Sequence, residues 1–478
     1  MNYRNIIFVF ARLISIEGVF LILSAFVALY YGGSDFNSLL FTGLGAFVVG
    51  WLLSAILKQE KGKMTKREGY LAVSLVWIVF SLVGAVPFVI SGYIPHYVDA
   101  FFETISGFTT TGVSIIPDVE VFPKGLLFWR SLTQWLGGMG IIVLSLAILP
   151  ALNVGGMQLF AAEVAGPTKD KLHPRITQTA KKLWLLYAGF TFLEALLLYL
   201  GGMSAFDAIT QSFTTLASGG FSTRTNSIGS FHSAYFEYII TIFMFIAGTN
   251  FSINYQLLRF NFSKVRKNEE FKFYSLIFFG ISILVAVVLY FNNHWDIEKS
   301  FRIALFHVAS TLTCTGFTTN GYLHWPTFVT LILIINMIMG GSAGSTAGGI
   351  KMIRVHVAIK NSFLELRRLI HPRAIIPLKY NGHSLSDSIV KSIMAFVFIY
   401  LLIFFVSVIV VSAMGYDLLT AMGSVATTLG GVGATMGQLL NYSGASDFGK
   451  LFFSFLMLIG RLEVFTVFML FSRHYWKN

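Results

Sequence analysis

The sequence predicts an all-α integral membrane protein of about ten transmembrane helices, and three observations carry this prediction. Of the 478 residues, 55% are hydrophobic and only 12% are charged, with a mean hydropathy of +0.73, whereas an average soluble domain carries about 25% charged residues. Apolar runs of about 20 residues, the length that crosses the hydrocarbon core, recur along the chain. Four shorter apolar segments alternate with them. This composition excludes a soluble enzyme and a disordered chain.

Ten apolar segments are long enough to span a bilayer. The first run continues directly into a second and lacks a small-residue cleavage site, so we expect a retained helix and no signal peptide. The expected spans are 13–31, 38–57, 70–92, 126–150, 182–201, 234–258, 272–291, 327–350, 388–414 and 450–472.

Basic residues give the expected orientation. The net charge is +12, and Lys and Arg gather in four loops, 58–67, 169–182, 259–272 and 351–379, which ten spans place on one side. The positive-inside rule puts these loops and both termini in the cytoplasm. The charge therefore indicates topology in a lipid bilayer, and we expect no nucleic-acid partner. The single cysteine, Cys314, allows no intramolecular disulfide.

An internal repeat organises the short segments, which cover about 99–109, 205–217, 301–313 and 418–429. Each precedes a glycine at a matched offset, with an alanine twelve residues and a Ser or Thr six residues before it. The glycines are Gly112, Gly220, Gly316 and Gly433, and the hydroxyl residues are Ser106, Thr214, Ser310 and Thr427. We expect two additional N-terminal helices (1–60) and four hairpin repeats around one axis, at 61–160, 161–262, 263–380 and 381–478.

The physical interpretation of this repeat is a pore. A helix of about 11 residues rises about 16 Å, half of the bilayer, so the chain must turn back at mid-depth. Irregular backbone is tolerated there only where it is buried in protein or lines a water-filled path. Four such turns would form a ring of carbonyl oxygens that replaces the water shell of a cation, and glycine adopts the required positive φ at low cost. The alternative, ordinary re-entrant segments, is disfavoured by four matched copies.

Several stretches resemble the Trk/Ktr/HKT superfamily of potassium transporters, and within it the membrane subunit of the Trk potassium uptake system. They are FFETISGFTTTG (101–112), GLLFWRSLTQWLGGMGI (125–141), TTLASGGFSTR (214–224), GGSAGSTAGGIK (340–351) and LIGRLEVFT (458–466). The resemblance implies four fused, potassium-channel-like helix–pore-loop–helix units with one filter glycine each. The two extra N-terminal spans favour the Trk type over the shorter Ktr type.

The resemblance also implies site residues and partners. K⁺ would bind at the filter only, with no other metal and no cofactor. The chain would lie in the bacterial inner membrane as a homodimer, with a cytosolic nucleotide-binding (TrkA-like) regulatory subunit on its cytoplasmic face. The implied filter residues are Thr110, Thr111, Gly112, Ser218, Gly219, Gly220, Cys314, Thr315, Gly316, Gly431, Val432 and Gly433.

A glycine-rich stretch interrupts the eighth span. Five glycines in ten residues disfavour a continuous helix, and the resemblance implies a mobile intramembrane gate in this stretch, which ends at Lys351. The alternative is close helix packing through small residues. Arg461 lies midway along the last span, where a charge is costly and usually faces a cavity; it either faces the permeation path or pairs with a neighbouring helix. The gate residues are Gly340, Gly341, Ser342, Ala343, Gly344, Ser345, Thr346, Ala347, Gly348, Gly349, Lys351 and Arg461.

Two other functions have partial support in the sequence. Gly340 to Gly344 fits the G-x-S-x-G pattern of serine hydrolases, but that nucleophile needs a strand–turn–helix setting with a His and an acid, so we expect no catalytic residues. An H⁺- or Na⁺-coupled K⁺ symporter would need a titratable group in the path, for which Glu194 and Glu463 are the mid-span candidates. The sequence leaves this alternative open.

Overall fold

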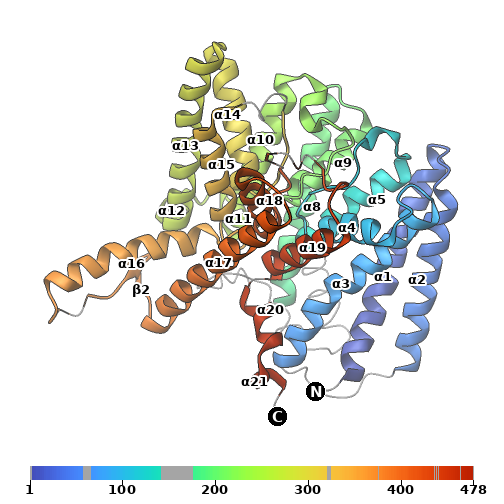
Figure 1. Ribbon diagram of the computed structural model, residues 1–478, viewed down its shortest axis with the longest axis horizontal. Coiled ribbons are helices and arrows are strands. Elements are labelled where there is room, and N and C mark those ends of the chain that lie inside the picture. Colours follow the sequence, from blue (N-terminus) through green and yellow to red (C-terminus); the bar gives the residue numbers. More distant parts are fainter. Residues whose placement is uncertain are drawn as a thin grey trace.

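The computed structural model describes residues 3–57, 66–140, 176–319, 325–374, 376–434, 436–437, 439, 441–462 and 464–476. The predicted all-α membrane fold is confirmed (Figure 1). Within the described residues, six helices are long and apolar enough to cross a membrane. They are α1 (Tyr3–Tyr30), α2 (Phe36–Ile56), α3 (Lys66–Ile90), α8 (Ile176–Leu200), α13 (Glu269–Asn293) and α17 (Asp387–Ala413).

One order of elements recurs four times after α2: a long helix, a short helix, a loop and a further helix. Two of the short helices begin at side-chain caps: Ser204 accepts the amide of Asp207, and Asp417 accepts the amide of Thr420. The short helices are α4 (Tyr97–Phe108), α9 (Ala205–Leu216), α14 (Ile297–Leu312) and α18 (Leu418–Gly430). The helices that follow the loops are α5 (Lys124–Trp135), α10 (Ala234–Gly248), α15 (Thr327–Met339) and α19 (Asp447–Leu462).

These last four helices differ from the predicted spans. The continuous span expected at 234–258 is wrong, because α10 and α11 (Phe251–Leu258) meet at 113°. Asn250 lies at this break and accepts the amide of Ser252, which begins the new helix. The span expected at 327–350 ends at Met339, where Gly340 has a φ of 71°. In the span expected at 126–150, α5 continues into a π-helical turn, Leu136–Gly140, and residues 141–150 lie outside the described residues. The span expected at 450–472 contains two helices, α19 and α20 (Val464–Phe471).

The two N-terminal helices form a close antiparallel pair through glycines. A Cβ atom on Gly18 would lie 2.6 Å from the carbonyl oxygen of Gly43, and one on Gly50 would lie 2.4 Å from that of Ala11. Such small residues allow transmembrane helices to approach closely. The turn between the two helices holds Asp35, whose carboxylate accepts the amide of Leu126 at 2.7 Å and so fixes the start of α5.

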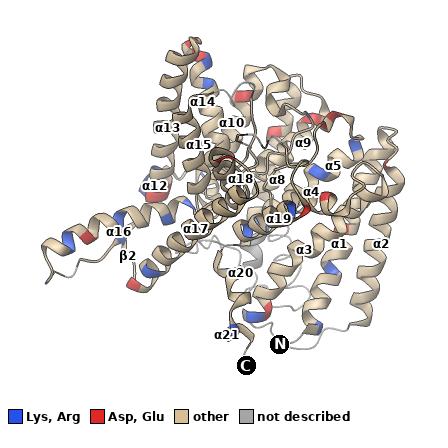
Figure 2. Cartoon of the chain, viewed as in Figure 1, with Lys and Arg blue, Asp and Glu red and all other residues tan. Residues whose placement is uncertain are grey.

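The remaining elements are short or lie at the ends of the long helices. The two chain ends lie at the same end of the molecule (Figure 1). Charged residues gather toward the helix ends, and Lys and Arg predominate along α16 (Figure 2). These elements are the 3₁₀ turns Val119–Val121 and Ser227–Phe231, helices α12 (Phe262–Lys267), α16 (Met352–Ile370) and α21 (Arg473–Trp476), and the strands β1 (Lys379–Tyr380) and β2 (His383–Ser384).

Strands β1 and β2 form an antiparallel hairpin around Asn381 and Gly382. Both turn residues have positive φ, 51° and 80°, as a two-residue hairpin turn of this kind requires. Asn381 exchanges two hydrogen bonds with Glu269, at 2.7 and 2.9 Å, so the hairpin is anchored to the start of α13. The repeat boundary expected between 380 and 381 falls inside this hairpin.

Candidate functional site: a ring of four glycine loops

Each short helix ends in the same backbone turn. The residue that leaves the helix has a left-handed φ, which non-glycine residues seldom adopt: 54° at Thr110, 52° at Ser218, 59° at Cys314 and 67° at Gly431. The next amide donates to the carbonyl five residues back, at 2.8–2.9 Å, which is the Schellman arrangement. The four bonds are Thr111 to Ser106, Gly219 to Thr214, Thr315 to Ser310 and Val432 to Thr427. We call 109–113, 217–221, 313–317 and 430–434 the glycine loops.

The four glycine loops contact one another in a closed ring. A Cβ atom added to Gly112 would lie 1.9 Å from the carbonyl oxygen of Gly219 in the second loop. A Cβ atom on Gly220 would lie 1.8 Å from the carbonyl oxygen of Thr315 in the third loop, and one on Gly316 would lie 1.8 Å from that of Val432 in the fourth. A Cβ atom on Gly433 would lie 2.6 Å from the carbonyl oxygen of Thr111, which returns to the first loop. Their φ values lie between 73° and 84°. Glycine is therefore required both for its conformation and for the approach of the neighbouring carbonyl.

In three of the repeats, a side-chain hydroxyl of the short helix hydrogen-bonds the glycine loop that follows it. The residue six positions before the glycine donates to the carbonyl of the residue after it. Ser106 bonds Val113 at 2.6 Å, Ser310 bonds Phe317 at 2.6 Å, and Thr427 bonds Ala434. At these three positions the matched Ser/Thr offset therefore has a structural cause, the anchoring of the loop to its own helix.

Gln134 takes this role in the second loop. The Thr214 hydroxyl bonds within its own helix. Gln134 of α5 instead donates from Nε2 to the Gly219 carbonyl at 2.7 Å and accepts the Phe221 amide at 3.0 Å. Gly219 thus carries a carbonyl that already has a protein donor. Sequence reasoning missed Gln134, although a lone amide within the apolar stretch LTQWL was a usable signal.

Buried and half-buried ion pairs join the surrounding helices. Arg130 of α5 contacts Glu103 of α4 at 2.6 Å and donates to the Ser222 carbonyl at 3.0 Å, which connects the first and second repeats. Lys450 of α19 pairs with Asp99 of α4 at 2.5 Å. Arg302 of α14 pairs with Glu237 of α10. Each pair fixes the position of at least one short helix and of the loop that follows it.

The α15–α16 linker, residues 340–351, is not helical, as its glycine content predicts. It lies against the second glycine loop, because the Thr346 hydroxyl is 2.8 Å from that of Ser218 and 3.0 Å from the Leu216 carbonyl. It also contacts the fourth, since a Cβ on Gly348 would lie 2.0 Å from the Gly430 carbonyl.

Further bonds dock the linker on the break between α10 and α11. The Ser342 amide donates to Gly248 at 2.9 Å, and the Phe251 amide donates to Gly344 at 3.1 Å. The Ala343 amide bonds Glu270 of α13 at 2.6 Å. Lys351, at the end of the linker, has a φ of 82° and donates to the Ala347 carbonyl. The linker is thus held by several single hydrogen bonds to three different elements.

Arg461 of α19 joins the linker to two other parts of the site. Its Nη1 donates to the Thr346 carbonyl at 3.2 Å and to the Thr110 hydroxyl at 3.3 Å. Its Nη2 donates to the Gly138 carbonyl at 2.6 Å and to that of Gly137. The structure therefore brings together the residues predicted for the filter and for the gate. Glu463 lies outside the described residues.

Comparison with known proteins gives a consistent result along the whole chain. The family model TrkH, a cation transport protein, matches residues 42–477. The chain is 40% identical over 484 aligned positions to the Trk system potassium uptake protein TrkH of Salmonella typhimurium, with 100% of both chains covered. It is 33% identical to TrkG of Escherichia coli, covering 95% of this chain and 94% of that protein.

The fold has a solved counterpart. The crystal structure of the potassium transporter TrkH from Vibrio parahaemolyticus superposes with a TM-score of 0.90 at 34% identity and covers 100% of both chains. The family model, the full-length relatives and the shared fold agree with the repeated hairpins described above. The chain belongs to the TrkH family of cation transport proteins.

Proposed function

We propose that this protein takes up K⁺ across the bacterial inner membrane through a gated, channel-like path whose selectivity filter is the ring of glycine loops. One observation carries the proposal: each of the four glycines lies against the carbonyl of the next loop, so that the contacts close around one centre. The names of the relatives support K⁺ as the ion, because they are Trk system potassium uptake proteins.

The chemistry of the ring suits a desolvated monovalent cation. Backbone carbonyls replace the hydration shell of K⁺ in filters of this kind. The four short helices end at the ring, and the partial negative charge of helix C-termini favours a cation there. Entry needs no ATP, since the membrane potential contributes about 2.3 kcal/mol per charge and 100 mV.

The α15–α16 linker and Arg461 would form the gate below this filter. The linker contacts the second and fourth loops and is held by individual hydrogen bonds, which can be exchanged without unfolding a helix. Arg461 adds a positive charge at the same place, which opposes cation passage while it remains there. Movement of the linker would withdraw both obstacles together.

Topology and assembly complete the proposal. We place both termini and helix α16 in the cytoplasm, which agrees with the basic loops and with the common end of the two termini (Figure 1). The four repeats would be the pore units, with the N-terminal helix pair packed beside the first. We further propose a homodimer and a cytosolic nucleotide-binding, TrkA-like subunit as regulator, because the relatives are named as parts of a Trk system.

An ion-coupled symporter is the second candidate. Glu194 of α8 is fully buried in a membrane span, and a buried acid at this depth is a functional residue by default. Reversal potentials under a proton or sodium gradient distinguish the candidates. For a channel, the reversal potential depends on the K⁺ gradient alone. For a symporter, the reversal potential also shifts with the gradient of the second ion, and Glu194→Gln abolishes that shift.

Substitution of a filter glycine tests the proposal. K⁺ and Na⁺ flux into proteoliposomes is compared for the wild type, Gly316→Ser and Gly280→Ala. A side chain at 316 collides with the Val432 carbonyl, so the K⁺/Na⁺ flux ratio falls at least several-fold. At Gly280 of α13 no atom lies within 4 Å of an added Cβ, so that variant keeps the wild-type ratio. An unchanged ratio in Gly316→Ser would refute the filter assignment.

A further inference from the structure

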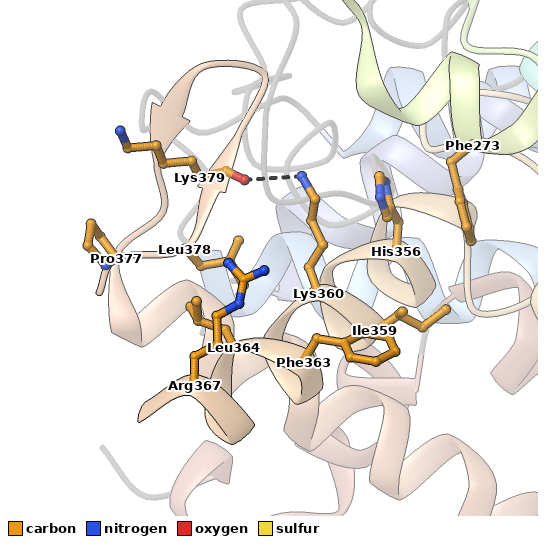
Figure 3. A pocket seen from close by; sticks show the side chains of 10 residues that line it. All are labelled: Phe273, His356, Ile359, Lys360, Phe363, Leu364, Arg367, Pro377, Leu378 and Lys379. Carbon is orange, nitrogen blue, oxygen red and sulfur yellow. Dashed lines mark hydrogen bonds between the residues drawn. The ribbon is translucent and has the colours of Figure 1, made fainter. Parts of the chain in front are cut away.

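We propose that the cytoplasmic end of this protein carries a binding site for an anionic phospholipid, in the pocket between helix α16 and the segment that enters the β1–β2 hairpin. The pocket has a volume of about 380 Å³, within the range of small-molecule sites. It is lined by Phe273, His356, Ile359, Lys360, Phe363, Leu364, Arg367, Pro377, Leu378 and Lys379 (Figure 3).

The lining combines the two chemistries of a phospholipid. Three cationic residues, Lys360, Arg367 and Lys379, line the pocket, and none of its ten lining residues is acidic. The rest of the wall is aliphatic or aromatic, and the exposed Phe363 and Ile359 continue it along α16. A phosphate group fits the cations, and an acyl chain fits the apolar wall.

Two of the three cations are open to a ligand. Lys360 already contacts Glu269 and donates to the Lys379 carbonyl at 3.3 Å. In the part of the chain that the structure describes, Arg367 and Lys379 make no ion pair through their side chains, and both are exposed. Figure 3 shows the Arg367 guanidinium beside Leu378, whereas the Lys379 side chain extends away from Lys360. Arg367 is therefore the expected phosphate donor, and Lys379 adds positive charge at the edge of the pocket.

The level of the pocket in the membrane supports a lipid as the occupant. Phe273 is the fifth residue of α13, and the hairpin leads within a few residues to α17; both helices are membrane spans. Helix α16 extends sideways from that end of α13 and not along it (Figure 1). Residues 351–379 hold seven Lys or Arg and one Glu, and a basic cluster directly beside a span favours anionic lipid headgroups.

Helix α16 itself has the character of a membrane-surface helix. Its exposed apolar residues include Phe363, Leu366, Leu369 and Ile370, with 57% to 77% of each exposed. Cationic residues lie between them along the same helix. A basic amphipathic helix of this kind lies in the plane of the headgroups with its apolar face in the acyl region.

The floor of the pocket is fixed before any ligand binds. His356 stacks on Phe273 with ring centroids 4.4 Å apart and an interplanar angle of 9°. Burial, together with the nearby charge of Lys360, lowers the pKa of His356 against the opposing effect of Glu269. His356 is thus neutral at pH 7 and serves as a stacked ring, so the positive charge of the pocket comes from the Lys and Arg residues.

Short-chain lipids test the site on the full-length protein in detergent. The apparent Kd is measured from the thermal shift with dioctanoyl phosphatidylglycerol, dioctanoyl phosphatidylcholine and glycerol 3-phosphate. The wild type should prefer phosphatidylglycerol over both others, because only that ligand offers both net charge and chains. In Arg367→Gln/Lys379→Gln the affinity should fall about 25-fold, since each Lys or Arg near an anionic surface contributes roughly fivefold.

A matched control removes the same charge elsewhere on this face. Lys264→Gln/Arg373→Gln deletes two exposed cations that do not line the pocket, and it should bind as the wild type does. The proposal is overturned if the two double variants bind equally, or if glycerol 3-phosphate binds as tightly as the lipid, which indicates a free-anion site. It is also overturned if light scattering shows that only the pocket variant changes oligomeric state while lipid affinity stays constant, because the face is then a protomer interface.

Discussion

Arg461 and Thr346 are joined by a hydrogen bond of 3.2 Å from the guanidinium to the backbone carbonyl, which connects the last membrane helix to the α15–α16 linker. The same guanidinium donates to Gly138 beyond the end of α5. One side chain therefore holds parts of the first, third and fourth repeats in one arrangement. The two interpretations that the sequence allowed for Arg461, a charge facing the path and a partner of neighbouring elements, are compatible at this position.

Two substitutions of Arg461 distinguish the effect of its positive charge on K⁺ flux from the effect of its hydrogen bonds. Arg461→Gln should raise basal K⁺ flux about tenfold, because a hydrogen bond to a charged group contributes about 1.5–3 kcal/mol and the linker loses such a bond at Thr346. Arg461→Lys keeps the charge, but an ammonium cannot reproduce the planar fork of donors. Flux is measured in proteoliposomes without the regulatory subunit. If the bonds hold the gate, Lys behaves as Gln does; wild-type flux in Arg461→Lys would show that charge alone opposes the ion.

Gly348 tests the docking of the linker under the fourth loop. A methyl group there would lie 2.0 Å from the Gly430 carbonyl, and its backbone conformation is not one reserved for glycine. Gly348→Ala should therefore displace the linker and raise basal flux, with little change in the K⁺/Na⁺ ratio, because the filter glycines remain. Electrophysiology on single proteins reports both quantities. Gly280→Ala serves as the neutral control, and a Gly348→Ala protein with wild-type gating would contradict the assignment of the gate.

Much of the site could be predicted because the same residue types recur at the same spacing in all four repeats. Glycine at one offset and Ser or Thr six positions earlier recur four times; the glycine has positive φ in all four copies, and the hydroxyl anchors the loop in three of them. Thr214 shows the limit of the pattern. It has the expected hydroxyl, yet Gln134 from another helix anchors its loop, and no spacing rule within one repeat reveals a partner from the preceding repeat.

The broken helices could not be predicted from hydropathy. Residues 234–258 are apolar enough for one span, but the chain bends by 113° because Thr249 and Asn250 end one helix and begin another. An average over 20 residues hides two polar residues, whereas the glycine-rich stretch after Met339 changes the composition enough to be recognised. The ion pairs around the ring escaped prediction for a related reason, since Glu103 and Arg130 are far apart in sequence and meet only in the folded chain.

The buried pair of Glu103 and Arg130 should be essential for stability. Glu103 also accepts the Ser114 hydroxyl and the Ile115 amide, so Glu103→Gln leaves Arg130 without its counter-charge in a buried place. Breaking such a pair costs about 3–5 kcal/mol. We expect a marked loss of melting temperature in detergent. The exposed pair of Arg368 and Glu365 is the control, and Glu365→Gln should change the melting temperature little; equal effects of the two substitutions would contradict a structural role for the buried pair.

Gln134 provides a test of selectivity that leaves every filter residue in place. In Gln134→Leu the Gly219 carbonyl loses its donor and the Phe221 amide loses its acceptor, at a cost of about 1–3 kcal/mol for each buried group left unpaired. The second loop then has neither a hydroxyl nor an amide to hold its shape, whereas the other three keep their anchors. The K⁺/Na⁺ flux ratio should therefore fall several-fold, and Gln134→Glu should restore only the bond to Phe221, because a carboxylate cannot donate to Gly219. If both variants retain the wild-type ratio while their melting temperatures fall, Gln134 stabilises the fold without shaping the filter.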